Sequence, residues 1–254
     1  MVDIHCHILP ALDDGAEDES VAREMAALAS ADGITHIVAT PHSNYRYQFD
    51  PEVNQRKQEE LQTVIGNSLI ILLGCDFHLS YENLEDVRKN PSRYTINGHQ
   101  YLLVEFADIS IPPNMDQIFF DLLARKLVPI ITHPERNPIL SQKPEQIGKW
   151  VEAGCLVQVT AGSFLGRFGK RAERSAKQLL RQGMVHFIAT DAHNTTSRPP
   201  LLSDARRAIA AEHGEETAQA LAELNPRAAV EGKPLPWQPQ PQPAAPRRWF
   251  SFHR

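Results

Sequence analysis

The stretch Val2-Asp3-Ile4-His5-Cys6-His7 predicts both the fold and the site, because a short apolar strand ends in two histidines. Residues two apart on a strand point to the same face, so the two imidazoles lie together and Cys6 points to the other face. The sequence Asp13-Asp14-Gly15 follows shortly afterwards. Two imidazoles and a carboxylate at a strand end are typical of the beginning of a metal site. Two surface histidines near a terminus are the alternative interpretation of this stretch alone.

Six further apolar segments have the length and the aliphatic composition of buried strands, and they alternate with segments of helical period. Strands that are apolar throughout are typical of a parallel sheet covered by helices on both faces. The sequence therefore predicts an α/β fold. The predicted strands are 2–7, 35–40, 68–74, 101–105, 127–132, 155–160 and 186–190. The predicted helices are 17–31, 51–65, 83–89, 115–125, 144–153 and 163–182, followed by one or two helices over 201–223.

Histidines and carboxylates lie at or just beyond the carboxyl ends of these strands. In a closed barrel these ends converge on one mouth, whereas the first and last strands of an open sheet can be too far apart to share a site. We therefore predict a TIM-like barrel with a metal site at its carboxyl mouth. The candidate ligands are His5, His7, Asp14, His42, Asp76, Glu105, His133, Asp191 and His193.

The size of this set predicts more than one metal ion. Five imidazoles and four carboxylates exceed the roughly three protein ligands that one catalytic zinc ion takes. Nitrogen and oxygen ligands without a thiolate favour manganese, iron or zinc over calcium. Two ions would be neutralised by the four carboxylates, whereas three would leave a charge of about +2, which suits a phosphate dianion.

Composition excludes several other classes of protein. The 254 residues are 42% hydrophobic and 22% charged, with a net charge of -5, which argues against a nucleic-acid partner. No apolar run approaches the roughly 20 residues that a transmembrane helix needs, and the N-terminal sequence does not signal secretion. Three cysteines without C-x-x-C spacing indicate a reducing cytoplasm. The sequence leaves the oligomeric state open.

The composition changes at Glu231, where a proline-rich segment without a period begins. Such a segment buries little apolar surface, so we predict one domain over residues 1–230 and an extended or disordered tail over residues 231–254. The tail ends in Arg247-Arg248-Trp249-Phe250-Ser251-Phe252-His253-Arg254. This end is either inert or makes a weak contact with a membrane surface or a partner.

Six short motifs, in this order along the chain, resemble those of the polymerase-and-histidinol-phosphatase (PHP) superfamily. The closer resemblance is to the bacterial manganese-dependent protein-tyrosine phosphatases of capsular and exopolysaccharide loci, and it covers about residues 1–229. The motifs are His5-Cys6-His7, Asp14-Gly15, Thr40-Pro41-His42, Leu103-Val104-Glu105-Phe106, His133-Pro134-Glu135-Arg136 and Asp191-Ala192-His193-Asn194.

This resemblance implies a distorted (β/α)7 barrel with three divalent metal ions, most often Mn²⁺, at the carboxyl mouth. It also implies a substrate, protein phosphotyrosine, often on the tail of a membrane-linked bacterial tyrosine kinase that drives polysaccharide export. Such an enzyme would act in the cytoplasm, beside the inner face of the membrane. One motif departs from the family pattern, because Asp76 and His78 stand where the family often has glutamate and arginine.

Arginine is the side chain that binds phosphoryl oxygens in a forked geometry. Arg136 and Arg198 follow the turns at His133 and His193, so we predict that both bind and stabilise the transferred phosphoryl group. Arg46 is a further candidate for substrate binding, although an exposed surface arginine is equally consistent with its position.

The residues argue against some rival mechanisms and leave other functions open. A thiolate phosphatase needs an arginine six residues after its cysteine, and those positions hold Leu12, Tyr81 and Ala161. A small-molecule phosphatase of the histidinol-phosphate type would use the same metal site. A nuclease of the superfamily would need a basic groove, which is not evident. A module that binds phosphotyrosine without hydrolysing it is the non-enzymatic alternative.

Overall fold

The computed structural model describes residues 1–240 of the chain, and within them eight parallel strands form two sheets. The sheets have the orders β1-β2-β3 and β4-β5-β6-β7-β8. The strands are β1 Val2–Cys6, β2 His36–Ala39, β3 Ile70–Leu73, β4 Phe77–His78, β5 Tyr101–Glu105, β6 Val128–Thr132, β7 Leu156–Thr160 and β8 Phe187–Ala189. Seven of them match the predicted strands within two residues at each end; only the two-residue β4 was not predicted.

The two sheets meet beside β1 and β8. There the amide of His7 donates to the carbonyl of Ala192 at 2.9 Å, and the amide of Asp191 donates to the carbonyl of His5 at 2.8 Å. On the other flank, β3 and β4 are not paired, and an isolated bridge joins His42 to Asp76. The predicted parallel α/β arrangement is therefore confirmed, whereas its closure into one barrel stays a prediction.

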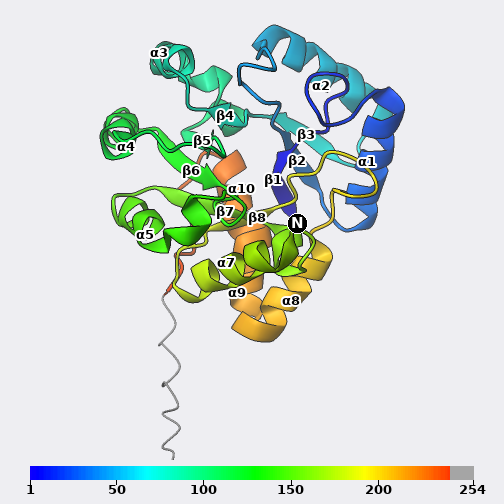
Figure 1. Ribbon diagram of the computed structural model, residues 1–254. Coiled ribbons are helices and arrows are strands. Elements are labelled where there is room, and N and C mark those ends of the chain that lie inside the picture. The colour runs from blue at the N-terminus through cyan, green and yellow to red at the C-terminus, as the bar shows by residue number, and fades with distance from the viewer. Residues whose placement is uncertain (241–254) are drawn as a thin grey trace, which may run out of the picture.

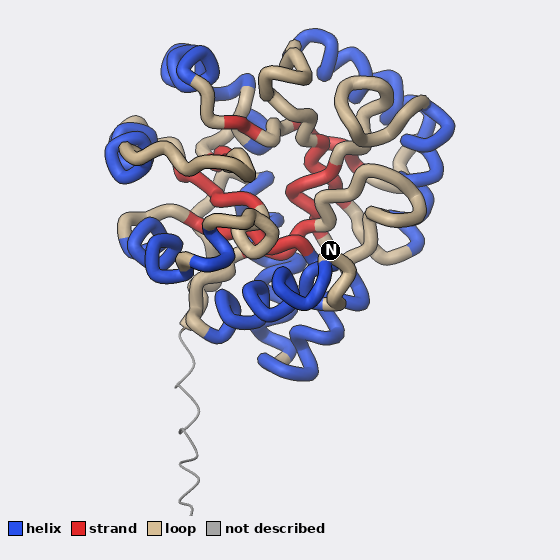
Figure 2. The backbone as a smooth tube through the Cα atoms, in the orientation of Figure 1, coloured by secondary structure: helices blue, strands red, loops and turns tan. Residues whose placement is uncertain are grey.

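Helices lie on the outside of the strands, with α1 and α2 beside the first sheet and α4 and α5 beside the second (Figure 1). Figure 2 shows the strands inside a ring of helices. The helices are α1 Glu19–Ala31, α2 Pro51–Ile65, α3 Tyr81–Lys89, α4 Met115–Ala124, α5 Pro144–Glu152, α6 Ala161–Phe164, α7 Gly169–Arg181, α8 Ser203–His213, α9 Glu215–Gln219 and α10 Asn225–Val230, with 3₁₀ turns η1 Pro91–Arg93, η2 Ile96–Gly98 and η3 Leu140–Gln142 and a π-helical segment η4 Ala220–Leu224.

Local sequence explains where several of these helices begin. The side chain of Asp18 accepts a hydrogen bond from the amide of Val21 at the start of α1. At the start of α2, Asp50 accepts from the amides of Glu52 and Val53, and Pro51 occupies the first turn. Both are N-cap arrangements that satisfy amides without a helical partner. These helices follow strands, so their N-termini lie on the same side as the strand ends.

The single helix predicted over residues 163–182 is wrong, because the chain forms α6 and α7 with a break between them. Gly166, inside this break, and Gly169, the first residue of α7, have φ angles of 73° and 85°. Such angles are open to glycine but disfavoured for other residues, so the helix ends where the glycines allow the chain to turn. The apolar residues on both sides of the break keep a helical period, so the sequence pattern predicted one continuous helix.

Two apolar clusters hold the layers together. The larger lies between strands and outer helices and includes Met25, Phe77 and Phe119. The smaller combines strand residues such as Ile4 and Leu103 with residues of α10. No helix in the described part of the chain is both long and apolar enough to cross a bilayer.

The proline-rich segment begins with residues that contact the domain. The carbonyl of Lys233 accepts a hydrogen bond from the Tyr101 hydroxyl at 2.7 Å, and the side chain of Asn225 bonds both the amide and the carbonyl of Trp237. The first part of the predicted tail therefore makes hydrogen bonds with the domain. The sequence beyond residue 240, with its basic and aromatic end, lies outside the described residues, so the domain boundary stays a prediction.

Candidate functional site

All nine candidate ligands come together at the carboxyl ends of the strands. Each follows or ends a strand or lies in the loop beyond it, as the parallel arrangement requires. Two of them, His133 and Asp191, have positive φ angles of 32° and 50°. Non-glycine residues in this conformation carry backbone strain of about 1–3 kcal/mol, which is common at functional sites. The chain therefore turns sharply beyond β6 and β8 in order to direct these side chains inward.

His5 and His7 share one face, as their spacing predicts. Their Nε2 atoms are 3.3 Å apart, and Asp76 Oδ2 lies 3.6 Å from His5 Nε2. The Asp191 Oδ1 atom lies 3.5 Å from the Nε2 atoms of both histidines. His5, His7 and Asp76 form one of three groups whose ligand atoms are close enough to hold an ion. Aspartate at position 76 therefore reaches the cluster despite its short side chain.

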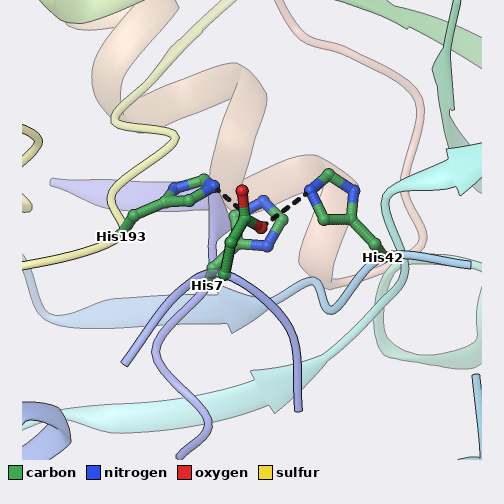
Figure 3. Close-up of side chains that lie close together, drawn as sticks. His7, His42 and His193 are labelled. Carbon is green, nitrogen blue, oxygen red and sulfur yellow. Dashed lines mark ion pairs between the residues drawn. The ribbon is translucent and has the colours of Figure 1, made fainter. Parts of the chain in front are cut away.

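A second group combines His7, Asp14, His42 and His193. The rings of His42 and His193 flank that of His7 (Figure 3). Asp14 Oδ1 lies 3.3 Å from His42 Nε2 and 3.6 Å from His193 Nε2. This group is most accessible to solvent at Asp14, because the Asp14 side chain is half exposed whereas the three histidines are largely buried.

The third group is His42, Asp76 and Glu105. The His42 Nδ1 atom lies 3.1 Å from Asp76 Oδ2 and 3.5 Å from Glu105 Oε2. His133 completes the cluster, with its Nε2 atom 3.9 Å from Glu105 Oε1. His78 stands beside this group, 3.9 Å from Glu105 Oε2, where the family pattern often has an arginine.

The donor set fits divalent metal ions. His42 Nδ1 and both carboxylate oxygens of Asp76 are buried, and the 3.1 Å approach of His42 Nδ1 to Asp76 Oδ2 lacks hydrogen-bond geometry, so none of the three atoms has a hydrogen-bond partner. Burial, assisted by Arg136, lowers the pKa of His133 to about 4, and burial with the neighbouring His7 lowers that of His193 to about 3. Both imidazoles are therefore neutral at pH 7 and offer a lone pair. The roles of the nine residues as ligands stay predictions.

Two further residues, which sequence reasoning did not assign, orient these histidines. Asp13 Oδ2 lies 2.7 Å from His7 Nδ1, and Gln158 Oε1 lies 3.0 Å from His5 Nδ1. Each oxygen accepts the Nδ1 proton, so the Nε2 atom of each ring is left to face the cluster. Burial lowers the pKa of His7, but Asp13 outweighs it and raises the pKa to about 9. An ion that binds at the Nε2 atom of His7 would displace the additional proton that the ring carries at pH 7.

The turn that carries Asp13 and Asp14 packs closely on the first histidine pair. A Cβ atom at Gly15 would lie 2.1 Å from the carbonyl oxygen of His7, so only glycine fits there. The Asp13 carboxylate also accepts hydrogen bonds from the amides of Gly15 and His42. The Asp13-Asp14-Gly15 sequence thus supplies one residue that orients His7 and one that faces the cluster.

Arg136 and Arg198 both pair with Asp191, in agreement with their predicted place at the site. The Arg198 Nη2 atom lies 2.6 Å from Asp191 Oδ2, and Arg136 Nη1 bonds the same oxygen. Burial raises the pKa of Asp191, but Arg136 and His5 hold it well below its usual range. The ring of Phe168, in the break between α6 and α7, lies against Arg136 and nearer to it than to Arg198.

Arg46 is not part of this cluster. It is exposed, and its guanidinium lies 5.4 Å from the ring centroid of its neighbour Tyr47. The Tyr47 ring in turn stacks on His42, with 5.9 Å between centroids and 11° between planes. In this loop Tyr47 thus contacts a candidate ligand, and Arg46 contacts Tyr47.

The cysteines are unsuited to nucleophilic catalysis. Cys6, Cys75 and Cys155 are at most 1% exposed. Burial raises the pKa of all three thiols, for Cys155 to about 12. A thiolate is the reactive form of cysteine, so none of these residues is activated.

Comparison with known proteins gives a match over nearly the whole domain. The family model described as "Capsular polysaccharide synthesis, CpsB/CapC" matches residues 1–231. The chain is 35% identical over 256 residues to the tyrosine-protein phosphatase YwqE of Bacillus subtilis, covering 99% of this chain and 100% of that protein. It is 38% identical over 208 residues to the putative tyrosine-protein phosphatase CapC of Staphylococcus aureus, covering 80% of each.

Solved structures also resemble this chain. A structure from a study of YwqE from B. subtilis and CpsB from Streptococcus pneumoniae, described as metal-dependent tyrosine phosphatases, has a TM-score of 0.89 and 33% identity, covering 96% of this chain and all of that one. The lactonase Lmo2620 of Listeria monocytogenes has a TM-score of 0.58 at 13% identity, so the likeness there is one of fold alone.

Proposed function

Because the chain belongs to the CpsB/CapC family of capsular polysaccharide synthesis, we propose that it is a metal-dependent protein-tyrosine phosphatase, a phosphoric monoester hydrolase. The observation that carries this proposal is the pairing of Arg136 and Arg198 with Asp191, inside a cluster of five histidines and four carboxylates. The cations that we propose to bind phosphate and the residues that we propose as metal ligands therefore meet at one edge of the fold.

We propose three divalent ions, most often Mn²⁺, in line with the three overlapping groups of ligand atoms. Iron and zinc suit the same nitrogen and oxygen donors. Bound there, the ions would supply Lewis acidity that stabilises charge on the phosphoryl oxygens and acidifies water. We also propose that the two sheets together form the distorted (β/α)7 barrel that brings these ligands to one mouth.

The chain's own residues would orient both the metal ligands and the substrate. Asp13 and Gln158 fix the rings of His7 and His5 through their Nδ1 atoms. Arg136 and Arg198 would grip the equatorial phosphoryl oxygens, on which negative charge accumulates during hydrolysis. The leaving phenolate has a pKa of about 10, which is lower than that of an alkyl alcohol, so protonation by a dedicated acid is less important.

Tyr47 and Phe168 would provide apolar contacts for the aryl group of the substrate. Tyr47 stacks on His42, and Phe168 lies against the two arginines. Aromatic rings at these places favour an aryl phosphate over the phosphate of a short aliphatic alcohol. We propose that the substrate is a phosphotyrosyl protein, such as a membrane-linked bacterial tyrosine kinase, and that hydrolysis takes place in the cytoplasm beside the membrane.

The test uses the full-length protein, stripped of metal by a chelator, dialysed and reloaded with Mn²⁺. Turnover of a phosphotyrosyl peptide should be lost on stripping, return on reloading and survive iodoacetamide, because the thiols are buried. Histidinol phosphate in parallel assays distinguishes the protein phosphatase from the small-molecule alternative. Activity that persists after stripping, or that iodoacetamide abolishes, would contradict the metal mechanism.

A further inference from the structure

Side-chain amides of α2 cover the free edge of β3, which within the described residues pairs with a strand on one side only. Gln62 donates to the carbonyl of Leu69 at 2.9 Å and accepts from the amide of Ile71 at 2.8 Å. Gln58 donates to the carbonyl of Ile71 at 2.8 Å. The two glutamines are four residues apart and therefore lie one above the other on the helix. They take the place of a neighbouring strand.

This amide ladder stops one turn earlier, at Asn54. The spacing of four continues from Gln62 and Gln58 to Asn54, but asparagine is one methylene group shorter. Its Nδ2 atom has no hydrogen-bond partner, although the residue is only 4% exposed. On the strand, the amides of Ile70 and Gly74 bond towards β2. The peptide groups of Leu73 therefore point away from β2, as those of Ile71 do, towards the position where the ladder is interrupted.

A cavity of about 410 Å³ lies at this interruption, and its lining includes both Asn54 and Leu73. Thr95, also in the lining, is 1% exposed, and its hydroxyl is a second buried group without a partner. Buried polar groups are nearly always hydrogen-bonded, so two unpaired ones beside one cavity indicate a missing partner. The volume lies in the range of small-molecule sites. None of the nine candidate metal ligands lines it.

The lining restricts the chemistry of the ligand. An open residue of a strand edge offers one amide and one carbonyl, which a secondary amide complements in both directions. Phe49, Pro51 and Leu73 offer an apolar surface, and Arg93 is the only charged residue among those that line the cavity. We propose that this cavity is a binding site for a small N-acylated ligand with an apolar body and a carboxylate, whose amide pairs with the edge of β3 and with Asn54.

The experiment titrates N-acetyl-L-leucine into the full-length, Mn²⁺-loaded protein and follows binding by calorimetry and by the shift in melting temperature. We expect saturable binding to the wild type and at least tenfold weaker binding to Asn54→Leu, which removes the unpaired amide at similar volume. Thr95→Val should weaken binding as well, and this variant serves if Asn54→Leu folds poorly. Gln146→Leu, on α5 and outside this cavity, is the matched control and should bind as the wild type does.

N-acetyl-L-leucinamide, which lacks the carboxylate, separates the two parts of the proposal. It should bind more weakly than the acid to the wild type, and Arg93→Ala should abolish the difference. Absence of saturable binding to the wild type up to ~10 mM would overturn the proposal, since even a weak specific ligand has a millimolar Kd. Equal affinity for the wild type, Asn54→Leu and Thr95→Val would overturn it too.

Discussion

The ring of Phe168 lies against the guanidinium group of Arg136, with 4.3 Å between the ring centroid and Cζ. Arg198 Cζ is 6.0 Å from the same centroid. One aromatic side chain thus contacts both cations that pair with Asp191. Because the guanidinium groups are attracted to the face of the ring, Phe168 restricts the positions that the two side chains can take.

Replacing this ring should lower catalysis without loss of metal. Phe168→Leu removes cation–π contacts of roughly 0.5–2 kcal/mol, so kcat/KM for a phosphotyrosyl peptide should fall about two- to thirtyfold. Phe168→Tyr should restore it, and Leu165→Ala in the same loop is the control. Metal content, measured by elemental analysis, should not change. A fall in bound metal would show instead that the ring supports the cluster of candidate metal ligands.

The two arginines should differ from the ligands in what their removal does. Arg136→Ala and Arg198→Ala should retain metal but lose about 1.5–3 kcal/mol of transition-state stabilisation each, or one to two decades in rate. His133→Ala should instead lower the amount of bound metal. Arg174→Ala, an exposed arginine of α7, is the control. Unchanged kinetics in both arginine variants would place the phosphate site elsewhere.

Asp13 should matter for metal affinity although we do not count it among the ligands. Asp13→Asn weakens the acceptor at His7 Nδ1, so Mn²⁺ affinity should fall about ten- to a hundredfold. The measurement is a Mn²⁺ titration of the stripped protein. Asp18→Asn is a matched control, because asparagine caps a helix as well as aspartate does. Equal affinities in wild type and Asp13→Asn would show that the carboxylate does not support the ligand.

His186 should make stability depend on pH. Its Nδ1 atom accepts a hydrogen bond from the Val157 amide, and burial lowers its pKa to about 4. Between pH 4 and the ordinary value near 6.5, the unfolded chain binds the extra proton, so stability is lost as the pH falls through this window. The loss amounts to about 3 kcal/mol.

Urea unfolding at pH 7 and pH 4.5 measures this effect. His186→Asn keeps an acceptor near the Val157 amide but does not titrate. The variant should therefore lose less stability than the wild type when the pH is lowered, and the difference isolates His186 from the other acidic transitions. Parallel curves for the two proteins would contradict the assignment.

The segment over residues 232–240 should contribute to the stability of the domain. Ending the chain after residue 231 removes six hydrogen bonds to the domain, among them one from the Tyr101 hydroxyl to the Lys233 carbonyl and two between Asn225 and Trp237. The free energy of unfolding should fall by roughly 3–9 kcal/mol, at about 0.5–1.5 kcal/mol for each bond. Ending it after residue 240 keeps these contacts and should leave the melting temperature unchanged. Equal stability of both truncations would place the domain boundary at residue 231.

The identity and the grouping of the candidate ligands followed from the sequence. Strand residues alternate between faces, and the carboxyl ends of parallel strands lie at one edge, so the apolar strand segments and the polar residues after them were enough to predict a common site. The pair His5 and His7 shows this most directly, because their spacing alone placed both rings on one face. Local periodicity also located seven of the eight described strands.

Other features were decided by the tertiary structure. Gln158 is 153 residues from His5 and Phe168 is 32 residues from Arg136, so no local pattern connects these partners. The break between α6 and α7 and the incomplete amide cover of β3 depend on how helices pack against strands. Sequence periodicity reports which face of an element is buried, whereas the partner that each buried polar group finds depends on distances across the fold, and these exist only once the chain has folded.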